Sequence, residues 1–117
     1  MERLKGKKQI EKLFTSGHSV GAFPLRLVYL ESDSTHKIGV SVSKKHFKNA
    51  VDRNRIKRLL RVAMGDSFSE VLEGLDFKYA VMVLYVGKEM PTTPNLKPQF
   101  ESLIKRFNKK QSNEVSS

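Results

Sequence analysis

The spacing of apolar residues predicts an amphipathic helix near the start of the chain. Ile10, Leu13 and Phe14 recur at positions i, i+3 and i+4, which places them on one side of a helix over residues 9–14. Gly17 follows three residues later and is a suitable C-cap. The first predicted element is therefore a short helix with one apolar side.

Three later segments have the composition of strands. Residues 25–30 are rich in strand-forming side chains, and residues 38–43 alternate apolar with small polar side chains. The polar residues 31–36 between them predict a turn, so we expect the two strands to pair as a hairpin. Residues 79–86 are apolar throughout, which predicts a central strand covered on both faces.

The strongest helical pattern covers residues 49–63. Asn49 or Asp52 can cap its first turn, because short polar side chains accept hydrogen bonds from the free backbone amides there. Gly65 is expected to end it. The acidic segment 66–73 predicts a short turn or helix.

The C-terminal third contains a second apolar stripe. We expect a loop where the chain is interrupted by Pro91, Pro94 and Pro98. A closing helix follows, and its apolar side is formed by Leu96, Phe100, Leu103, Ile104 and Phe107. Residues 109–117 predict a frayed end.

The predicted order is helix, two strands, helix, strand, helix. This order predicts an α+β sandwich in which helices pack on one small sheet. A chain of 117 residues favours one domain with one core. We assign this domain to residues 1–111 and expect a disordered tail over residues 112–117.

Composition adds a strong positive charge to this picture. The chain has 22 Lys and Arg against 12 Asp and Glu, which gives a formal net charge of +10. Such a surplus favours a polyanionic partner, either nucleic acid or an anionic membrane surface. The chain has no cysteine, which excludes disulfides, thiolate metal sites and a Cys nucleophile. It also has no apolar run that resembles a secretory signal or a membrane span, so we expect a cytoplasmic protein.

The basic residues gather in one part of the chain. Nine of them lie within residues 37–61, where only Asp52 opposes them. They are Lys37, Lys44, Lys45, Lys48, Arg53, Arg55, Lys57, Arg58 and Arg61.

On a helical wheel these charges form one face of the predicted helix 49–63. The basic residues cover roughly 0° to 200°, and the apolar residues lie between about 240° and 340°. A solvated helix face usually mixes charges, whereas Arg53, Lys57 and Arg61 follow one another one turn apart. We therefore favour an anion-binding face, with Asn54 near its middle to pair with a base edge or a 2′-hydroxyl.

The strand 38–43 leads directly into Lys44 and Lys45. Ser41 and Ser43 share one side of this strand and leave a small polar surface beside the lysines. Such a surface can approach a nucleic-acid backbone closely, but a strand edge facing solvent explains the pattern equally well.

Side chains suited to protein catalysis are sparse. His18, His36 and His46 lie in predicted turns without carboxylate partners at useful spacing, so we expect them at the surface. There are no paired carboxylates in an apolar setting and no Gly-rich loop to hold a phosphate. The sequence therefore predicts neither a catalytic site nor a metal site in the protein.

Two ordered runs, residues 38–45 and 48–61, resemble the signature of the bacterial ribonuclease P protein family. Its centre is an Arg-Asn-Arg motif, which stands here as Arg53, Asn54 and Arg55. The resemblance implies a four-stranded sheet with about three helices, similar to a domain of a small-subunit ribosomal protein. It also implies a left-handed βαβ crossover, whereas general connection rules predict the right-handed form.

The resemblance also implies a function. Proteins of this family are subunits of an enzyme whose catalyst is an RNA. With Mg²⁺, bound mainly by the RNA subunit, that enzyme cleaves precursor tRNA endonucleolytically and releases the 5′ leader. The implied partners are the catalytic RNA and precursor tRNA, with no membrane and no required protein partner.

Site residues follow from the same resemblance. The residues expected to bind the catalytic RNA are Lys44, Lys45, Asn49, Arg53, Asn54, Arg55, Lys57, Arg58 and Arg61. The residues expected to bind the leader, in a cleft between the first helix and the sheet, are Ile10, Phe14, Val28, Ser41 and Ser43. Tyr29 is expected to point to the opposite face of the sheet.

Two other classes of function stay open. One is a structured-RNA-binding protein of ribosomal type without a ribozyme partner, which the basic helix permits. The other is a basic helix on a membrane surface, which needs free apolar groups for lipid. The second is disfavoured, because Ile56, Leu59 and Leu60 are needed for the core.

Overall fold

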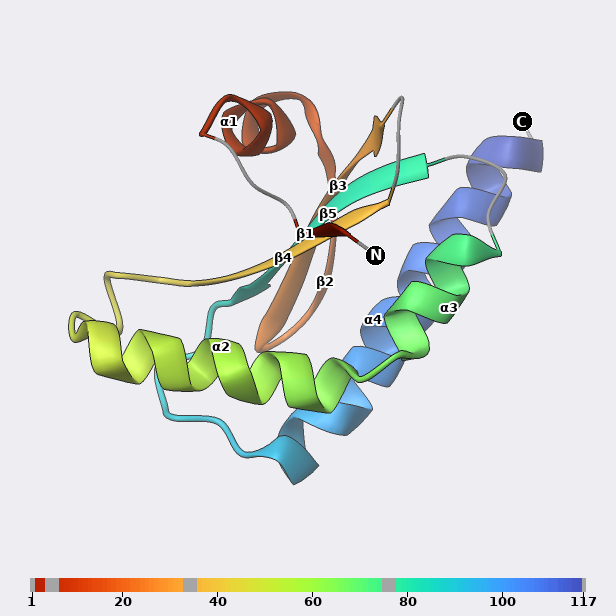
Figure 1. Ribbon diagram of the computed structural model, residues 1–117. Coiled ribbons are helices and arrows are strands. Elements are labelled where there is room, and N and C mark those ends of the chain that lie inside the picture. Colours follow the sequence, from red (N-terminus) through yellow and green to blue (C-terminus); the bar gives the residue numbers. More distant parts are fainter. Residues whose placement is uncertain (1, 4–6, 33–35, 75–77, 117) are drawn as a thin grey trace.

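The computed structural model describes residues 2–3, 7–32, 36–74 and 78–116. Figure 1 shows one sheet with helices on both of its faces. The elements are β1 Glu2–Arg3, α1 Lys7–Ser16, β2 His18–Ala22, β3 Leu25–Ser32, β4 Lys37–Val42, α2 Ala50–Met64, α3 Ser67–Glu73, β5 Lys78–Tyr85 and α4 Thr93–Ser116.

The sheet has the strand order β1-β4-β5-β3-β2. Strand β5 pairs parallel with β4 and antiparallel with β3, and β2 pairs antiparallel with β3. The predicted hairpin between residues 25–30 and 38–43 is wrong, because β5 lies between β3 and β4. The cause is the composition of β5, whose side chains are apolar on both faces and therefore favour the centre of the sheet.

The predicted α+β class is confirmed. Four strands of at least five residues form the sheet, and the two-residue β1 adds a short parallel edge beside β4. The crossover from β4 to β5 passes through α2 and α3 and joins parallel neighbours. The left-handed sense of this crossover stays a prediction. Strand β2 was absent from the sequence-based order, because residues 18–22 have little strand-forming composition.

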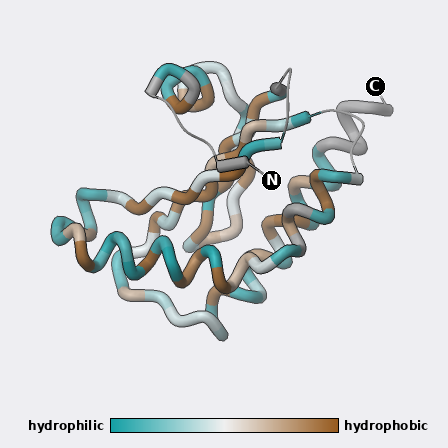
Figure 2. Tube along the Cα trace, in the orientation of Figure 1, coloured by the Kyte–Doolittle hydropathy of each residue, from teal (hydrophilic) through white to brown (hydrophobic). Residues whose placement is uncertain are grey.

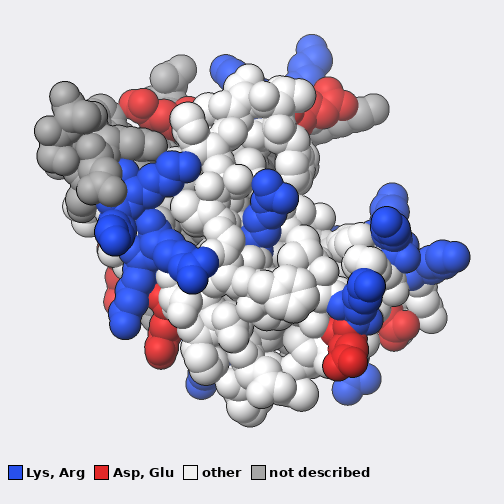
Figure 3. All heavy atoms as spheres, turned by 180° about the vertical axis from the view of Figure 1, so that it is seen from behind, with Lys and Arg blue, Asp and Glu red and all other residues white. Residues whose placement is uncertain are grey.

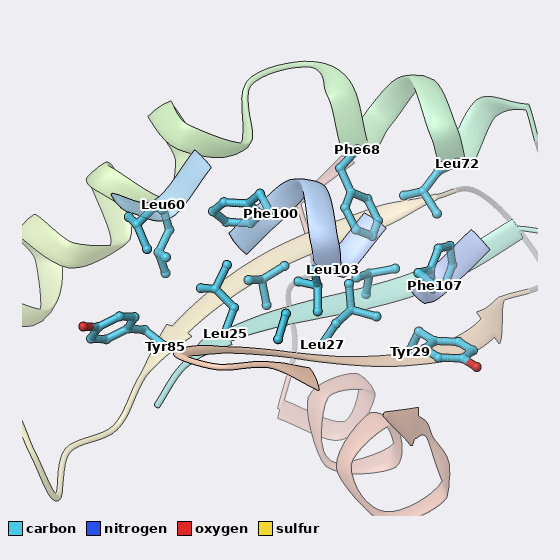
Figure 4. Close-up of a cluster of buried hydrophobic side chains, with 14 of the residues drawn as sticks. Leu25, Leu27, Tyr29, Leu60, Phe68, Leu72, Tyr85, Phe100, Leu103 and Phe107 are labelled. Carbon is cyan, nitrogen blue, oxygen red and sulfur yellow. The ribbon is translucent and has the colours of Figure 1, made fainter. Parts of the chain in front are cut away.

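The main core lies between the sheet and the layer formed by α2, α3 and α4 (Figure 4). Phe107 is fully buried there, with its ring centroid 5.0 Å from that of Tyr29 and 5.6 Å from that of Phe68. Tyr29 is 1% exposed within this core, so the expectation that it points away from the first helix is confirmed.

Helix α1 covers the other face of the sheet. Its fully buried Leu13 packs with Val28, Ala80 and Met82, a second and smaller apolar cluster. The Gly17 N–H donates to the Leu13 carbonyl at 2.9 Å and so ends the helix. Gly17 also lies close to β3, since a Cβ on it would be 2.9 Å from the carbonyl oxygen of Tyr29. A Cβ at Gly17 would lie 2.3 Å from the carbonyl oxygen of Leu13, so only glycine fits there.

The ends of α2 are where the sequence predicts them. The Asn49 side-chain oxygen accepts a hydrogen bond from the Val51 N–H at 3.0 Å, as an N-cap does. At the other end Gly65 has φ 55°, in the left-handed region, and donates to the Arg61 carbonyl at 3.1 Å. The following α3 confirms the short helix expected over residues 66–73.

Helix α4 begins earlier than its prolines suggest. Pro94 lies in the first turn, where its missing N–H has no helical partner to lose, and Pro98 lies inside the helix. The expected loop through Pro98 is therefore wrong, and the apolar stripe on both sides of it holds the helix on the core. The sequence predicts a disordered end over 112–117, whereas α4 runs to Ser116. Extending a helix by further residues costs little once it has formed.

Candidate nucleic-acid interface

The outward face of α2 carries the predicted block of positive charge. Ile56 and Leu60 are fully buried against the sheet and α4. On the other side Asn54, Arg55 and Arg58 are exposed, as is Arg61. Hydrophilic and hydrophobic bands alternate along this helix in Figure 2. The division into a core face and a basic face is as the wheel predicts.

Arg53 differs from the other cations of this helix. Its guanidinium nitrogen Nη1 donates to the carbonyls of Phe47 and Lys48, both at 2.8 Å, and the side chain is half-buried. These two bonds hold the turn before α2 against the helix. Arg53 therefore positions the neighbouring basic residues, a role that its place in the motif did not predict.

The turn between β4 and α2 presents two more predicted cations. The Ser43 hydroxyl accepts from the Lys45 N–H at 3.2 Å, and the Ser43 carbonyl accepts from the Phe47 N–H at 3.1 Å. The Phe47 ring lies 6.1 Å from that of Tyr85, which ties the turn to β5. Lys44 and Lys45 are exposed at its tip. Ser43 thus supports the turn, beside the basic face of α2.

The positive charge of α2 is not neutralised by the residues that the structure describes. Among the residues the structure describes, Arg55, Lys57, Arg58 and Arg61 have no hydrogen-bond or ion-pair partner from their side chains. Unpaired cations one turn apart repel each other, and a bound polyanion would relieve that repulsion. The guanidinium forks on this face match the geometry of phosphate oxygens.

The predicted leader residues gather around α1 to different extents. Phe14 is 48% exposed and Ile10 is half-buried on the same helix. Val28 is only 7% exposed beneath α1, so it forms part of the floor and offers little surface. Ser41 lies on the same sheet face as Val28, because it pairs with Leu84, two residues along β5 from the Val28 partner Met82.

Two exposed residues near the sheet have no counterpart among the predicted site residues. Arg26 pairs with Leu84, is exposed on the α1 face and donates to the Ser19 hydroxyl at 3.4 Å. The sequence does set Arg26 apart, since it is the single charged residue among the apolar residues of segment 25–30. Phe23, 75% exposed at the turn between β2 and β3, had no such signal because β2 was not predicted.

The histidines are not all at the surface. His36 is 6% exposed, and its Nδ1 accepts from the Tyr79 N–H at 3.2 Å, so the expected surface position is wrong for this residue. The reason is a long-range contact that the local sequence does not encode. Within the described residues, no group of three or more His, Asp or Glu could hold a metal ion. No helix among them is long and apolar enough to cross a membrane.

Comparison with known proteins identifies the family. The sequence model of the family described as Ribonuclease P matches residues 1–108. The chain belongs to the ribonuclease P protein family. The matched residues include the Arg-Asn-Arg motif, all the strands of the sheet and most of α4.

Curated relatives agree with this assignment. The chain is 45% identical over 76 residues to the ribonuclease P protein component of Streptococcus thermophilus, covering 64% of this chain and 67% of that protein. It is 35% identical over 106 residues to that of Brevibacillus brevis, covering 89% of this chain and 81% of the relative.

Solved structures of ribonuclease P proteins share the fold. The Staphylococcus aureus protein superposes with a TM-score of 0.68 at 25% identity, over 90% of this chain and 94% of that one. The Thermotoga maritima protein gives a TM-score of 0.71 at 20% identity, over 91% of this chain and 97% of that one, and supports the fold alone.

The predicted function is confirmed at the level of the family. The chain is a protein subunit of the tRNA-processing ribonucleoprotein enzyme ribonuclease P, which implies an RNA partner. The alternative of a ribosomal-type protein without a ribozyme partner finds no support in these comparisons.

Proposed function

We propose that the chain binds the catalytic RNA of ribonuclease P through the outward face of α2 together with the turn that precedes this helix. The residues of this surface are Lys44, Lys45, Asn49, Asn54, Arg55, Lys57, Arg58 and Arg61. The observation that carries the proposal is the set of cations on α2 that have no partner among the described residues. RNA phosphates would neutralise them and release counterions, which favours binding at low salt.

The side of the sheet under α1 is suited to a single-stranded segment of precursor tRNA, the 5′ leader. Phe14 offers an exposed aromatic ring on which an unpaired base can stack. Ser41 and Arg26 lie on the same sheet face with polar groups for the backbone of the leader. In this arrangement the protein holds the leader while the RNA subunit cleaves it.

The catalytic step itself belongs to the RNA in this proposal. Mg²⁺ would be bound mainly by the RNA subunit, and the protein would add positive charge where phosphates crowd together. No further protein partner is required by this arrangement, and we place the assembly in the cytoplasm.

The test is cleavage of a precursor tRNA by a bacterial ribonuclease P RNA at low Mg²⁺, with and without the protein. We expect the protein to restore cleavage at the mature 5′ end. The variant Arg55→Ala/Arg58→Ala should lose this effect, because it removes two exposed cations of α2 and leaves Arg53 in place. Lys88→Ala/Lys97→Ala is the control that removes the same charge elsewhere. A wild-type protein that binds RNA but leaves cleavage unchanged would refute the proposal.

A second test addresses the leader. Phe14→Ala should weaken binding of precursor tRNA by the assembled enzyme by about 1–3 kcal/mol, the range for one stacked base. Binding of mature tRNA, which lacks the leader, should stay as it is. An equal loss of affinity for both tRNAs would show that Phe14 does not contact the leader.

A further inference from the structure

A second group of basic side chains lies on the C-terminal half of α4. Lys105, Arg106 and Lys109 are exposed and Lys110 is half-buried, so four cations stand within six residues. Figure 3 shows Lys and Arg side chains gathered at the left, over this helix. In Figure 1 this half of α4 runs away from α2. We call these four residues the α4 basic patch; it is separate from the basic face of α2.

Two members of the patch are fixed against the edge strand β2. The Arg106 guanidinium donates to the Gly21 carbonyl, and Lys110 Nζ donates to the Ser19 carbonyl at 3.4 Å. Lys110 Nζ also lies 5.6 Å from the centroid of the Tyr29 ring. These contacts cover outward carbonyls of an edge strand that would otherwise be open to pairing. Arg106 and Lys110 thus have a structural role.

Lys105 and Lys109 have no comparable role. Both are exposed, they stand one turn apart, and neither has a hydrogen-bond or ion-pair partner within the part of the chain that the structure describes. Four cations held this closely repel one another, and the fixed positions of Arg106 and Lys110 prevent the group from spreading. A bound polyanion would remove this cost.

The chemistry of α4 favours RNA over lipid as the polyanion. The apolar side of the helix is used in the core, where Leu103 and Phe107 are fully buried. A helix that lies on a membrane needs such side chains free for the acyl region. Phosphate groups need only the cations that α4 does expose.

We infer that the α4 basic patch binds the phosphate backbone of a second segment of the catalytic RNA. The inference rests on the function proposed above. Helix α2 packs beside β4, whereas the patch is bonded to β2 at the other side of the sheet, three strand spacings or roughly 14 Å from β4. The patch therefore offers the RNA a surface of its own, apart from the basic face of α2. A leader held under α1 lies on the other face of the sheet from α4. The catalytic RNA is therefore the partner that the patch fits.

The test is the salt dependence of binding to ribonuclease P RNA alone. The variant Lys105→Ala/Lys109→Ala removes two unpaired cations and leaves the bonds of Arg106 and Lys110 to β2 in place. We expect the slope of log affinity against log salt to fall by about 1.4–1.8 in magnitude, which is about 0.7–0.9 for each phosphate that the variant no longer neutralises. Between about 50 and about 200 mM salt, the variant should lose about tenfold less affinity than the wild type.

The control variant Lys88→Ala/Lys97→Ala removes the same charge outside the patch and should keep the wild-type slope. An unchanged slope in the patch variant overturns the inference, and an equal fall in the control overturns it too, since net charge alone would then explain the result. If Arg55→Ala/Arg58→Ala leaves affinity unaltered, the proposed function fails instead. A patch variant that binds the RNA normally but weakens precursor tRNA binding by the assembled enzyme overturns the assignment to the catalytic RNA.

Discussion

Arg53 and Arg55 stand two positions apart on α2 and use the same chemistry for different purposes. Arg53 bonds to two loop carbonyls, whereas Arg55 is exposed without a partner among the described residues. We expect Arg53→Ala to lower the free energy of unfolding by about 1–3 kcal/mol, because the variant cannot form either bond from a charged donor. Arg55→Ala should change it by less than about 0.5 kcal/mol.

Urea denaturation of both variants, together with their affinity for the catalytic RNA, checks this contrast. Arg53→Lys is the matched variant, since it keeps the charge and loses the forked donor. If Arg53→Ala folds as stably as the wild type, the bonds to the loop contribute nothing and Arg53 returns to the RNA-binding set.

His36 gives the fold a dependence on pH. Burial lowers the pKa of His36 from its usual 6.5, and the charge of Lys78 lowers it further, against the opposing effects of Glu73 and the Leu72 carbonyl. The unfolded chain therefore binds a proton at a higher pH than the folded chain does. Stability from this residue is complete above the unfolded pKa and declines as the pH falls below about 6.5.

Denaturation at about pH 7.5 and about pH 5.5 measures this effect. The wild type should lose stability at the lower pH, and His36→Gln should lose less, since an amide oxygen can accept from the Tyr79 N–H without titrating. The same loss in both proteins would assign the pH dependence to other groups.

Some side-chain positions follow from the local sequence, and others depend on the fold. The exposure of Arg55, Arg58 and Arg61 follows from helical geometry, which is local, and it was predicted correctly. The bonds of Arg53 and the burial of His36 join residues whose proximity depends on the folded chain. The spacing of residues along the sequence does not predict contacts that form only in the folded chain.

At the scale of elements, the docking of α4 depends on its aromatic side chains. Phe107 is fully buried and contacts the rings of Phe68, Tyr29 and Tyr79. We expect Phe107→Ala to lower the free energy of unfolding by about 3–5 kcal/mol, from reduced burial and the cavity that remains. Val62→Ala, at a side chain that is 59% exposed on α2, should be nearly neutral.

Thermal or urea unfolding followed by circular dichroism separates these two variants. A small effect for Phe107→Ala would mean that the C-terminal half of α4 packs weakly on the sheet. The α4 basic patch would then lack a firm support, so the same measurement bears on the second RNA surface.

Elements were predictable where their apolar pattern is long. Helix α2, the central β5 and the stripe of α4 have many apolar positions in register, and their existence followed from the sequence. Strand β2 has five residues with few strand formers and is stabilised by its pairing with β3. Pro98 predicts a loop, but it lies inside α4. Packing of the apolar residues on both sides of it outweighs the hydrogen bond that proline cannot form.

At the scale of the whole molecule, the net charge of +10 acts on stability as well as on binding. Repulsion among the cations of α2 and of the α4 basic patch opposes compact folding. We expect the melting temperature to rise between about 50 and about 500 mM NaCl, because salt screens this repulsion.

The variant Lys57→Gln/Lys105→Gln, which lowers charge in both clusters, should melt higher than the wild type at low salt and respond less to NaCl. Differential scanning calorimetry at matched pH gives both quantities. A melting temperature that does not depend on salt would show that repulsion within the two clusters does not destabilise the protein in the absence of RNA.

The arrangement of the strands was the least predictable property of the fold. The α+β class follows from the order of the elements, whereas the position of β5 between β3 and β4 depends on pairings between residues far apart in the chain. The Arg-Asn-Arg motif, by contrast, could be recognised without any knowledge of that arrangement.

The central position of β5 has a consequence during translation. Every residue assigned to an RNA contact on α1, β3, β4 or α2 is made before β5, yet β3 and β4 are joined only through it. While the ribosome is still adding the residues before Lys78, the nascent chain carries its basic helix without the sheet that orients it. The protein therefore becomes able to hold its RNA in the folded geometry late in synthesis, after its most strongly charged segment has been made.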